Sequence, residues 1–140
     1  MRPWHNLRVL AEARFVLGAG AGGCLVGALA SLLVPPFPWV ADPVAPAVRT
    51  IVRVAHGVGL GWWAGIFWGL FAALLARAQK SPPPVDKLPP LGLAAAAVAL
   101  VALALARLGE LPTQWGVLGA LALALVGTRV GLALTARDHR

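Results

Sequence analysis

The sequence predicts an all-α integral membrane protein with four transmembrane helices, arranged as two hairpins with both termini in the cytoplasm. Apolar residues make up 59% of the 140 residues, charged residues make up 12%, and the mean hydropathy is +0.80. Soluble domains carry about 25% charged residues. The chain also contains four apolar runs, each close to the roughly 20 residues that a helix needs to cross a bilayer. Finally, lysine and arginine gather in the two tails and the middle connection, which is the pattern of cytoplasmic segments.

Residues 1–14 predict an interfacial segment on the cytoplasmic side. In this stretch Trp4, Leu7 and Leu10 fall on one side of a helix, whereas Arg8 and Glu12 fall on another. A mildly amphipathic helix of this kind can lie along a membrane surface. We therefore expect the chain to follow the interface and then to turn into the bilayer at residue 15.

The first transmembrane hairpin is predicted at residues 15–78. Its two runs are residues 15–34, which contain no charged side chain, and residues 54–76, in which only His56 can titrate. The connection at residues 35–46 contains Asp42 but no lysine or arginine, and Arg49 and Arg53 lie just before the second run. This composition places the connection outside the cytoplasm.

The first run contains Gly18-x-Gly20-x-x-Gly23, which is the glycine spacing of a dinucleotide-binding turn. That turn needs a preceding strand and a parallel sheet, and the apolar runs leave no sequence for a sheet. A helix explains the small residues better, because they recur at every fourth position and form one ridge, made of Ala19, Gly23, Gly27 and Ser31. We interpret this ridge as a helix–helix contact face. Its partner is another helix of this chain, a second copy or another subunit.

Residues 79–90 predict a proline-rich cytoplasmic loop between the hairpins. Its five prolines make it a semi-rigid spacer. The second hairpin is predicted at residues 91–135, with an outside connection in which Glu110 offsets Arg107. Residues 136–140 form a cytoplasmic tail.

A polar stripe opens the second run. Arg49, Arg53 and His56 recur at steps of four and three and share one helical face, and Trp63 continues that face toward the bilayer centre. Such a stripe fits an acidic lipid headgroup, a quinone head or a tetrapyrrole, whose metal a single histidine can ligate. In the alternative interpretation, both arginines extend to the outer interface and His56 bonds a neighbouring helix. The sequence therefore leaves the cofactor unknown.

Arg129 is the one charge well inside an apolar run. It lies about 8 Å along the helix axis from Leu134, so its side chain can reach the cytoplasmic interface. The other interpretation pairs it with a carboxylate of a partner subunit. No aspartate or glutamate lies inside any run, and the sequence has no Ser–His pair, metal-ligand cluster or phosphate-binding loop. These features argue against an enzyme and against a proton-coupled carrier.

Two main functions remain, and a third is a cofactor-binding anchor that uses His56. The net charge is +7, but the basic residues lie at the ends of apolar runs and form no basic patch, so we expect no nucleic-acid partner. We first expect a small non-catalytic subunit of a larger respiratory or photosynthetic electron-transport complex in the inner membrane, packed against lipids, a cofactor and other membrane subunits. The alternative is a small homo-oligomeric transporter or channel for an anionic or lipid-linked substrate, with Arg49, Arg53 and Arg129 as selectivity charges.

Overall fold

The computed structural model describes residues 3–33, 45–79 and 82–137. Within these ranges the chain forms four long helices and one short 3-10 helix and contains no strand. The elements are α1 (Pro3–Leu33), α2 (Pro46–Arg77), η2 (Val85–Lys87), α3 (Leu88–Leu108) and α4 (Thr113–Arg137). All four α-helices are long and apolar enough to cross a membrane. The predicted all-helical class with four such helices is therefore confirmed.

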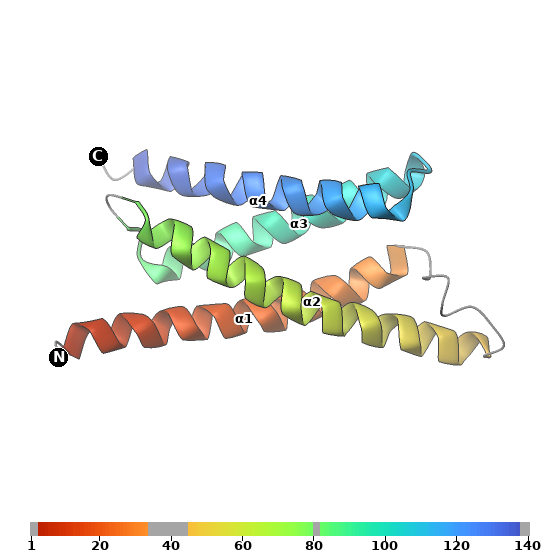
Figure 1. Ribbon diagram of the computed structural model, residues 1–140, viewed down its shortest axis with the longest axis horizontal. Coiled ribbons are helices and arrows are strands. Elements are labelled where there is room, and N and C mark those ends of the chain that lie inside the picture. The colour runs from red at the N-terminus through yellow and green to blue at the C-terminus, as the bar shows by residue number, and fades with distance from the viewer. Residues whose placement is uncertain (1–2, 34–44, 80–81, 138–140) are drawn as a thin grey trace.

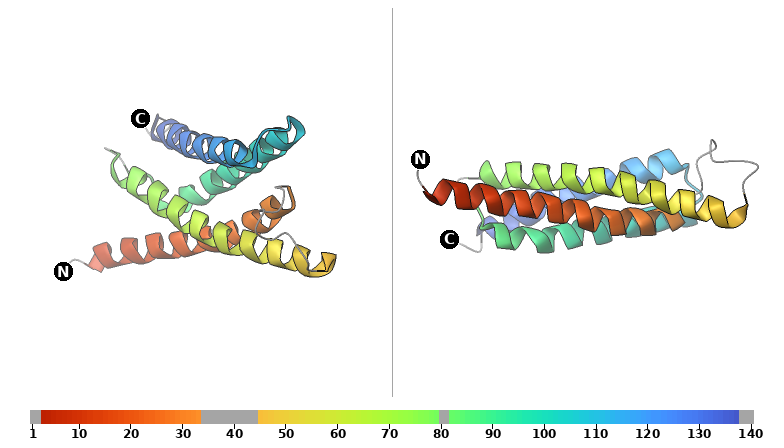
Figure 2. Two further views of the ribbon diagram at one scale, coloured as in Figure 1. Left: turned by 45° about the vertical axis from the view of Figure 1, so that its right-hand side comes forward. Right: turned by 90° about the horizontal axis from the view of Figure 1, so that it is seen from below.

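The helices form two antiparallel hairpins, α1 with α2 and α3 with α4 (Figure 1). The first hairpin is the longer one, and its two helices cross near their middles (Figure 2). One end of the bundle therefore gathers the N-terminus of α1, the C-terminus of α2, the N-terminus of α3 and the C-terminus of α4. We call this the first end, and the other the second end.

Proline and a left-handed residue mark the boundaries of the elements. Pro46 occupies the first turn of α2, and Pro89 and Pro90 occupy the first turn of α3, where a missing N–H breaks no helical hydrogen bond. Residues 109–112 join α3 to α4. Glu110 turns the chain there with a φ of 54°, and Leu111 N–H donates to the Ala106 carbonyl at 3.0 Å.

α1 continues through residues 14 and 15, where the sequence analysis expected a turn. Helix α1 is unbroken for 31 residues, so no turn separates residues 3–14 from the first run. Two physical reasons account for this. No glycine or proline lies between Leu7 and Phe15, and Glu12 bonds α2, which holds this part of α1 in the hairpin.

A buried cluster joins the two hairpins near the first end. Ala76 of α2, Leu88 of α3 and Leu132 of α4 form a small buried cluster there, and Phe15 of α1 packs against it. Most large apolar side chains point away from the protein, and α3 buries only Leu88 and Ala95. The interior of this bundle is small, and its outer surface is apolar.

Candidate functional site

Small residues bring the backbones of α1 and α2 into direct contact. A Cβ placed on Gly61 would lie 2.0 Å from the carbonyl oxygen of Gly23, and one placed on Gly23 would lie 2.0 Å from that of Gly61. No side chain fits at these positions. The contact, which we call the glycine seam, is made of Ala19, Gly23, Gly27 and Ser31 on α1 and Gly57, Gly61, Gly65 and Gly69 on α2.

Each close approach in the glycine seam points a Cα hydrogen at a carbonyl of the other helix. Weak Cα–H···O contacts of this kind recur between closely packed helices. Five glycines make such an approach, with the Cβ direction ending 1.9–2.3 Å from an oxygen: Gly23, Gly27, Gly57, Gly61 and Gly65. The sequence analysis left open which helix faces the small residues of α1, and in the structure it is α2 of the same chain. It overlooked the four glycines of α2, although they repeat at the same spacing of four.

The predicted polar stripe on α2 is divided in the structure. Arg53 turns toward α1 and donates to the carbonyl oxygen of Ser31 at 2.7 Å, and Arg107 of α3 donates to the carbonyl oxygen of Leu33. The last carbonyls of a helix lack partners within the helix and carry its negative dipole end. Two cations therefore cap the C-terminus of α1. Arg49 lies one turn before Arg53 and is half-buried.

His56 and Trp63 face outward instead. His56 is exposed, and its Nδ1 lies 3.0 Å from the carbonyl oxygen of Val52. If Nδ1 carries the proton, it donates to this carbonyl, and the Nε2 lone pair is available to ligate a metal. Trp63 is 60% exposed and contacts Phe67, with the ring centroids 6.4 Å apart. In the described part of the chain, no group of three His, Cys, Asp or Glu residues could hold a metal ion.

A buried ion-pair group at the first end was missed by the sequence analysis, which assigned Glu12 to the interface. The Glu12 side chain is only 9% exposed. It accepts hydrogen bonds from Arg77 of α2, whose Nε lies at 3.1 Å, and from Arg8 one turn earlier, also at 3.1 Å. This group ties α1 to α2 beyond the glycine seam.

Trp68 connects α2 with the other three helices. Its indole N–H donates to the hydroxyl of Thr128 on α4 at 2.8 Å, and that hydroxyl donates to the Ala124 carbonyl at 2.7 Å. The ring also packs against Phe15 of α1, with centroids 5.7 Å apart. A Cβ on Gly92 of α3 would lie 2.9 Å from the indole, so this glycine makes room for the ring.

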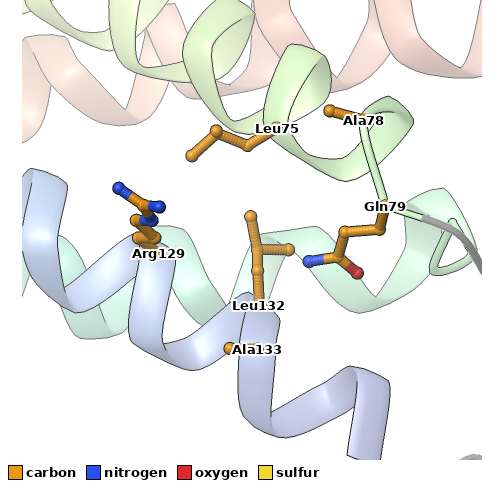
Figure 3. Close-up of a pocket in the computed structure, with 6 residues that line it drawn as sticks. All are labelled: Leu75, Ala78, Gln79, Arg129, Leu132 and Ala133. Atoms are coloured by element: carbon orange, nitrogen blue, oxygen red, sulfur yellow. The ribbon is translucent and has the colours of Figure 1, made fainter.

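Arg129 lines a cavity between the two hairpins. The cavity has a volume of about 190 Å³ and lies between the last turn of α2 and the C-terminal half of α4 (Figure 3). Its lining consists of Leu75, Ala78, Gln79, Arg129, Leu132 and Ala133. We call it the Arg129 cavity. Arg129 is exposed, and no group in the described ranges forms a hydrogen bond or ion pair with it. The Gln79 Oε1 atom is buried, and no group in the same ranges bonds to it.

No protein-family model, curated protein or solved structure matches this chain. Its function is therefore inferred from the arrangement of its own side chains.

Proposed function

We propose that this chain is a small non-catalytic subunit of a larger membrane complex. One observation carries the proposal: most strong polar groups in the described residues bond the chain's own helices, and the outer surface is left apolar. Arg53 and Arg107 bond the C-terminal end of α1, and the Glu12 group ties α1 to α2. Such an interior supports a scaffold better than it supports a reaction or a conduction path.

Uncovered helix faces support assembly with other subunits. Helix α3 buries two residues, and a Cβ on Gly18 or Gly22 of α1 would meet no atom within 4 Å. These two glycines lie one turn apart on a side of α1 that α2 does not cover. Small residues at such a spacing allow a second helix to approach closely. We assign this face to a helix of a partner subunit.

Electron-transport complexes of the inner membrane are the class to test first. His56 presents an outward imidazole, and the exposed Trp63 lies two turns further along α2. An imidazole beside an aromatic surface suits a flat tetrapyrrole held jointly with another subunit. In this proposal both termini lie in the cytoplasm, in keeping with the distribution of lysine and arginine.

The transporter alternative has weaker support. An anion path requires its selectivity charges to line one passage. Arg53 is bonded to Ser31 near the second end, whereas Arg129 lies in the half of α4 that approaches the first end. The Arg129 cavity does not contain Arg53.

The mass of the native particle tests the proposal. Gentle extraction from the native membrane should give a particle far heavier than a few copies of 14.5 kDa, with other subunits in it. Gly22→Leu should release these subunits, whereas the matched change Gly127→Leu, at another glycine with open space, should retain them. A particle made only of a few copies of this chain would refute the proposal and favour the homo-oligomeric transporter.

A further inference from the structure

The Arg129 cavity contains two polar groups that the proposed function does not use. One wall carries the guanidinium of Arg129, and the other carries the amide of Gln79 (Figure 3). The remaining lining consists of leucine and alanine. The walls come from the end of α2 with the two residues that follow it and from α4, so a ligand in the cavity would touch both hairpins.

Arg129 is placed to meet an anion at the level of the lipid headgroups. It lies within the apolar segment Thr113–Thr135, six residues before its end, which is about 9 Å along the helix axis. A charge in such a segment is stabilised when its side chain extends to the interface or meets an opposite charge. A guanidinium binds phosphate through two parallel hydrogen bonds, and phospholipids present phosphate at this depth.

The volume and layout of the cavity favour a headgroup with a polar extension. Pockets for small molecules have volumes of about 300–1,000 Å³, so about 190 Å³ is too small for most free substrates. Leu132 lies between Arg129 and Gln79, so an isolated phosphate or a single carboxylate on Arg129 would leave Gln79 without a partner (Figure 3). A hydroxyl both donates and accepts hydrogen bonds. In Figure 3 the Gln79 nitrogen points toward Leu132 and Arg129, so a headgroup hydroxyl can accept a hydrogen bond from it, whereas an ammonium group has no acceptor to offer.

We propose that the Arg129 cavity binds the phosphoglycerol headgroup of an anionic phospholipid of the phosphatidylglycerol class. The phosphate bonds Arg129, a headgroup hydroxyl bonds Gln79, and the acyl chains remain outside the cavity. The bound lipid joins α2 to α4, which adds to the contact between the two hairpins near the first end. The inference requires that the chain lies in a membrane, and it does not depend on the proposed subunit role.

Lipid titration of the purified, delipidated chain tests this inference. Short-chain phosphatidylglycerol is added in mild detergent, and bound lipid is counted by native mass spectrometry. Short-chain phosphatidylethanolamine, phosphatidylcholine and free glycerol 3-phosphate are run in parallel. We expect phosphatidylglycerol to bind with a stoichiometry of one at low concentration. Arg129→Gln should weaken its binding about tenfold or more, since a hydrogen bond to a charged group is lost.

Two variants separate the cavity from general attraction of charge. Arg137→Gln removes a cation from the same end of α4 but not from the cavity, and it should change the affinity less than about twofold. Gln79→Leu should reduce the preference for phosphatidylglycerol over phosphatidylethanolamine. Circular dichroism verifies that each variant is folded, and Arg129 makes no internal bond in the described ranges whose loss would disturb the fold.

Four results would overturn the inference. Arg129→Gln could bind phosphatidylglycerol as tightly as the unchanged chain does. Arg137→Gln could lose as much affinity as Arg129→Gln. Glycerol 3-phosphate could bind as tightly as the lipid, which would indicate a site for a free phosphate ester. Phosphatidylethanolamine or phosphatidylcholine could bind as tightly as phosphatidylglycerol, which would show that the phosphoglycerol headgroup is not recognised.

Discussion

The glycine seam allows a sharp test of what holds α1 against α2. In Gly61→Ala, the new Cβ would lie 2.0 Å from the Gly23 carbonyl oxygen and 2.9 Å from the Gly27 Cα. The shortest ordinary contact between carbon and oxygen is about 3.3 Å, so the helices would have to separate by about 1.3 Å at this point. Both partners are backbone atoms, which cannot rotate away as a flexible side chain can.

The magnitude follows from the contacts that the separation weakens. Five Cα–H···O approaches cross the seam, and each contributes about 0.5–1 kcal/mol. Separation at Gly61 removes its own two and weakens the neighbouring ones, so we expect Gly61→Ala to reduce the free energy of unfolding by about 1–3 kcal/mol. Overpacking of a tight core has an effect of the same size, about 1–3 kcal/mol.

Gly59→Ala is the matched control, because it makes the same change two residues away on α2. A Cβ on Gly59 meets no atom within 4 Å. Alanine favours a helix over glycine by about 1 kcal/mol, so this variant should be as stable as the unchanged chain or more stable. Unfolding in mixed micelles with increasing fractions of sodium dodecyl sulfate, followed by circular dichroism, measures both variants. Equal unfolding midpoints for Gly61→Ala and Gly59→Ala would refute the reasoning.

Two further predictions use the same unfolding assay, and a third uses amide hydrogen exchange. Trp68→Phe and Thr128→Val should each lower the free energy of unfolding by about 0.5–1.5 kcal/mol, because each removes the hydrogen bond between these two side chains. The double variant should lose less stability than the sum of the two single variants, since it removes the same bond only once. A fully additive loss would contradict the bond. Glu12→Gln should destabilise the chain more than Arg8→Gln does, because Glu12 is buried and bonds α2 whereas Arg8 is exposed. Equal effects of the two changes would argue against the pair between Glu12 and Arg77. Arg107→Gln should increase amide hydrogen exchange in the last turn of α1, and unchanged exchange there would show that Arg107 does not cap this helix.

The sequence predicted the helices well because long apolar runs have few alternatives. The small residues at every fourth position of α1 likewise indicated a contact face without identifying its partner. The partner became apparent only with the structure, although Gly57, Gly61 and Gly65 repeat at the same period.

The internal bonds of the polar residues could not be predicted, because they join positions far apart in the chain. From the sequence, Arg53 could bind a lipid headgroup or cap another helix with equal ease. Only the position of α1 in the structure favours the cap. Glu12 lies 65 residues from Arg77, and Trp68 lies 60 residues from Thr128. No periodicity within one helix specifies such pairs, since they depend on how the hairpins are packed.

The unequal packing of the two hairpins has a consequence for biosynthesis. The first hairpin is complete at Arg77 and is held by its own backbone, whereas Trp68 acquires its α4 partner only near the end of the chain. At synthesis rates of about 5–20 residues per second, the roughly 60 residues up to the end of α4 take about 3–12 seconds. During that interval the nascent first hairpin exposes its indole N–H to its surroundings. The close backbone contact thus gives an early intermediate a fixed shape, onto which the later helices dock.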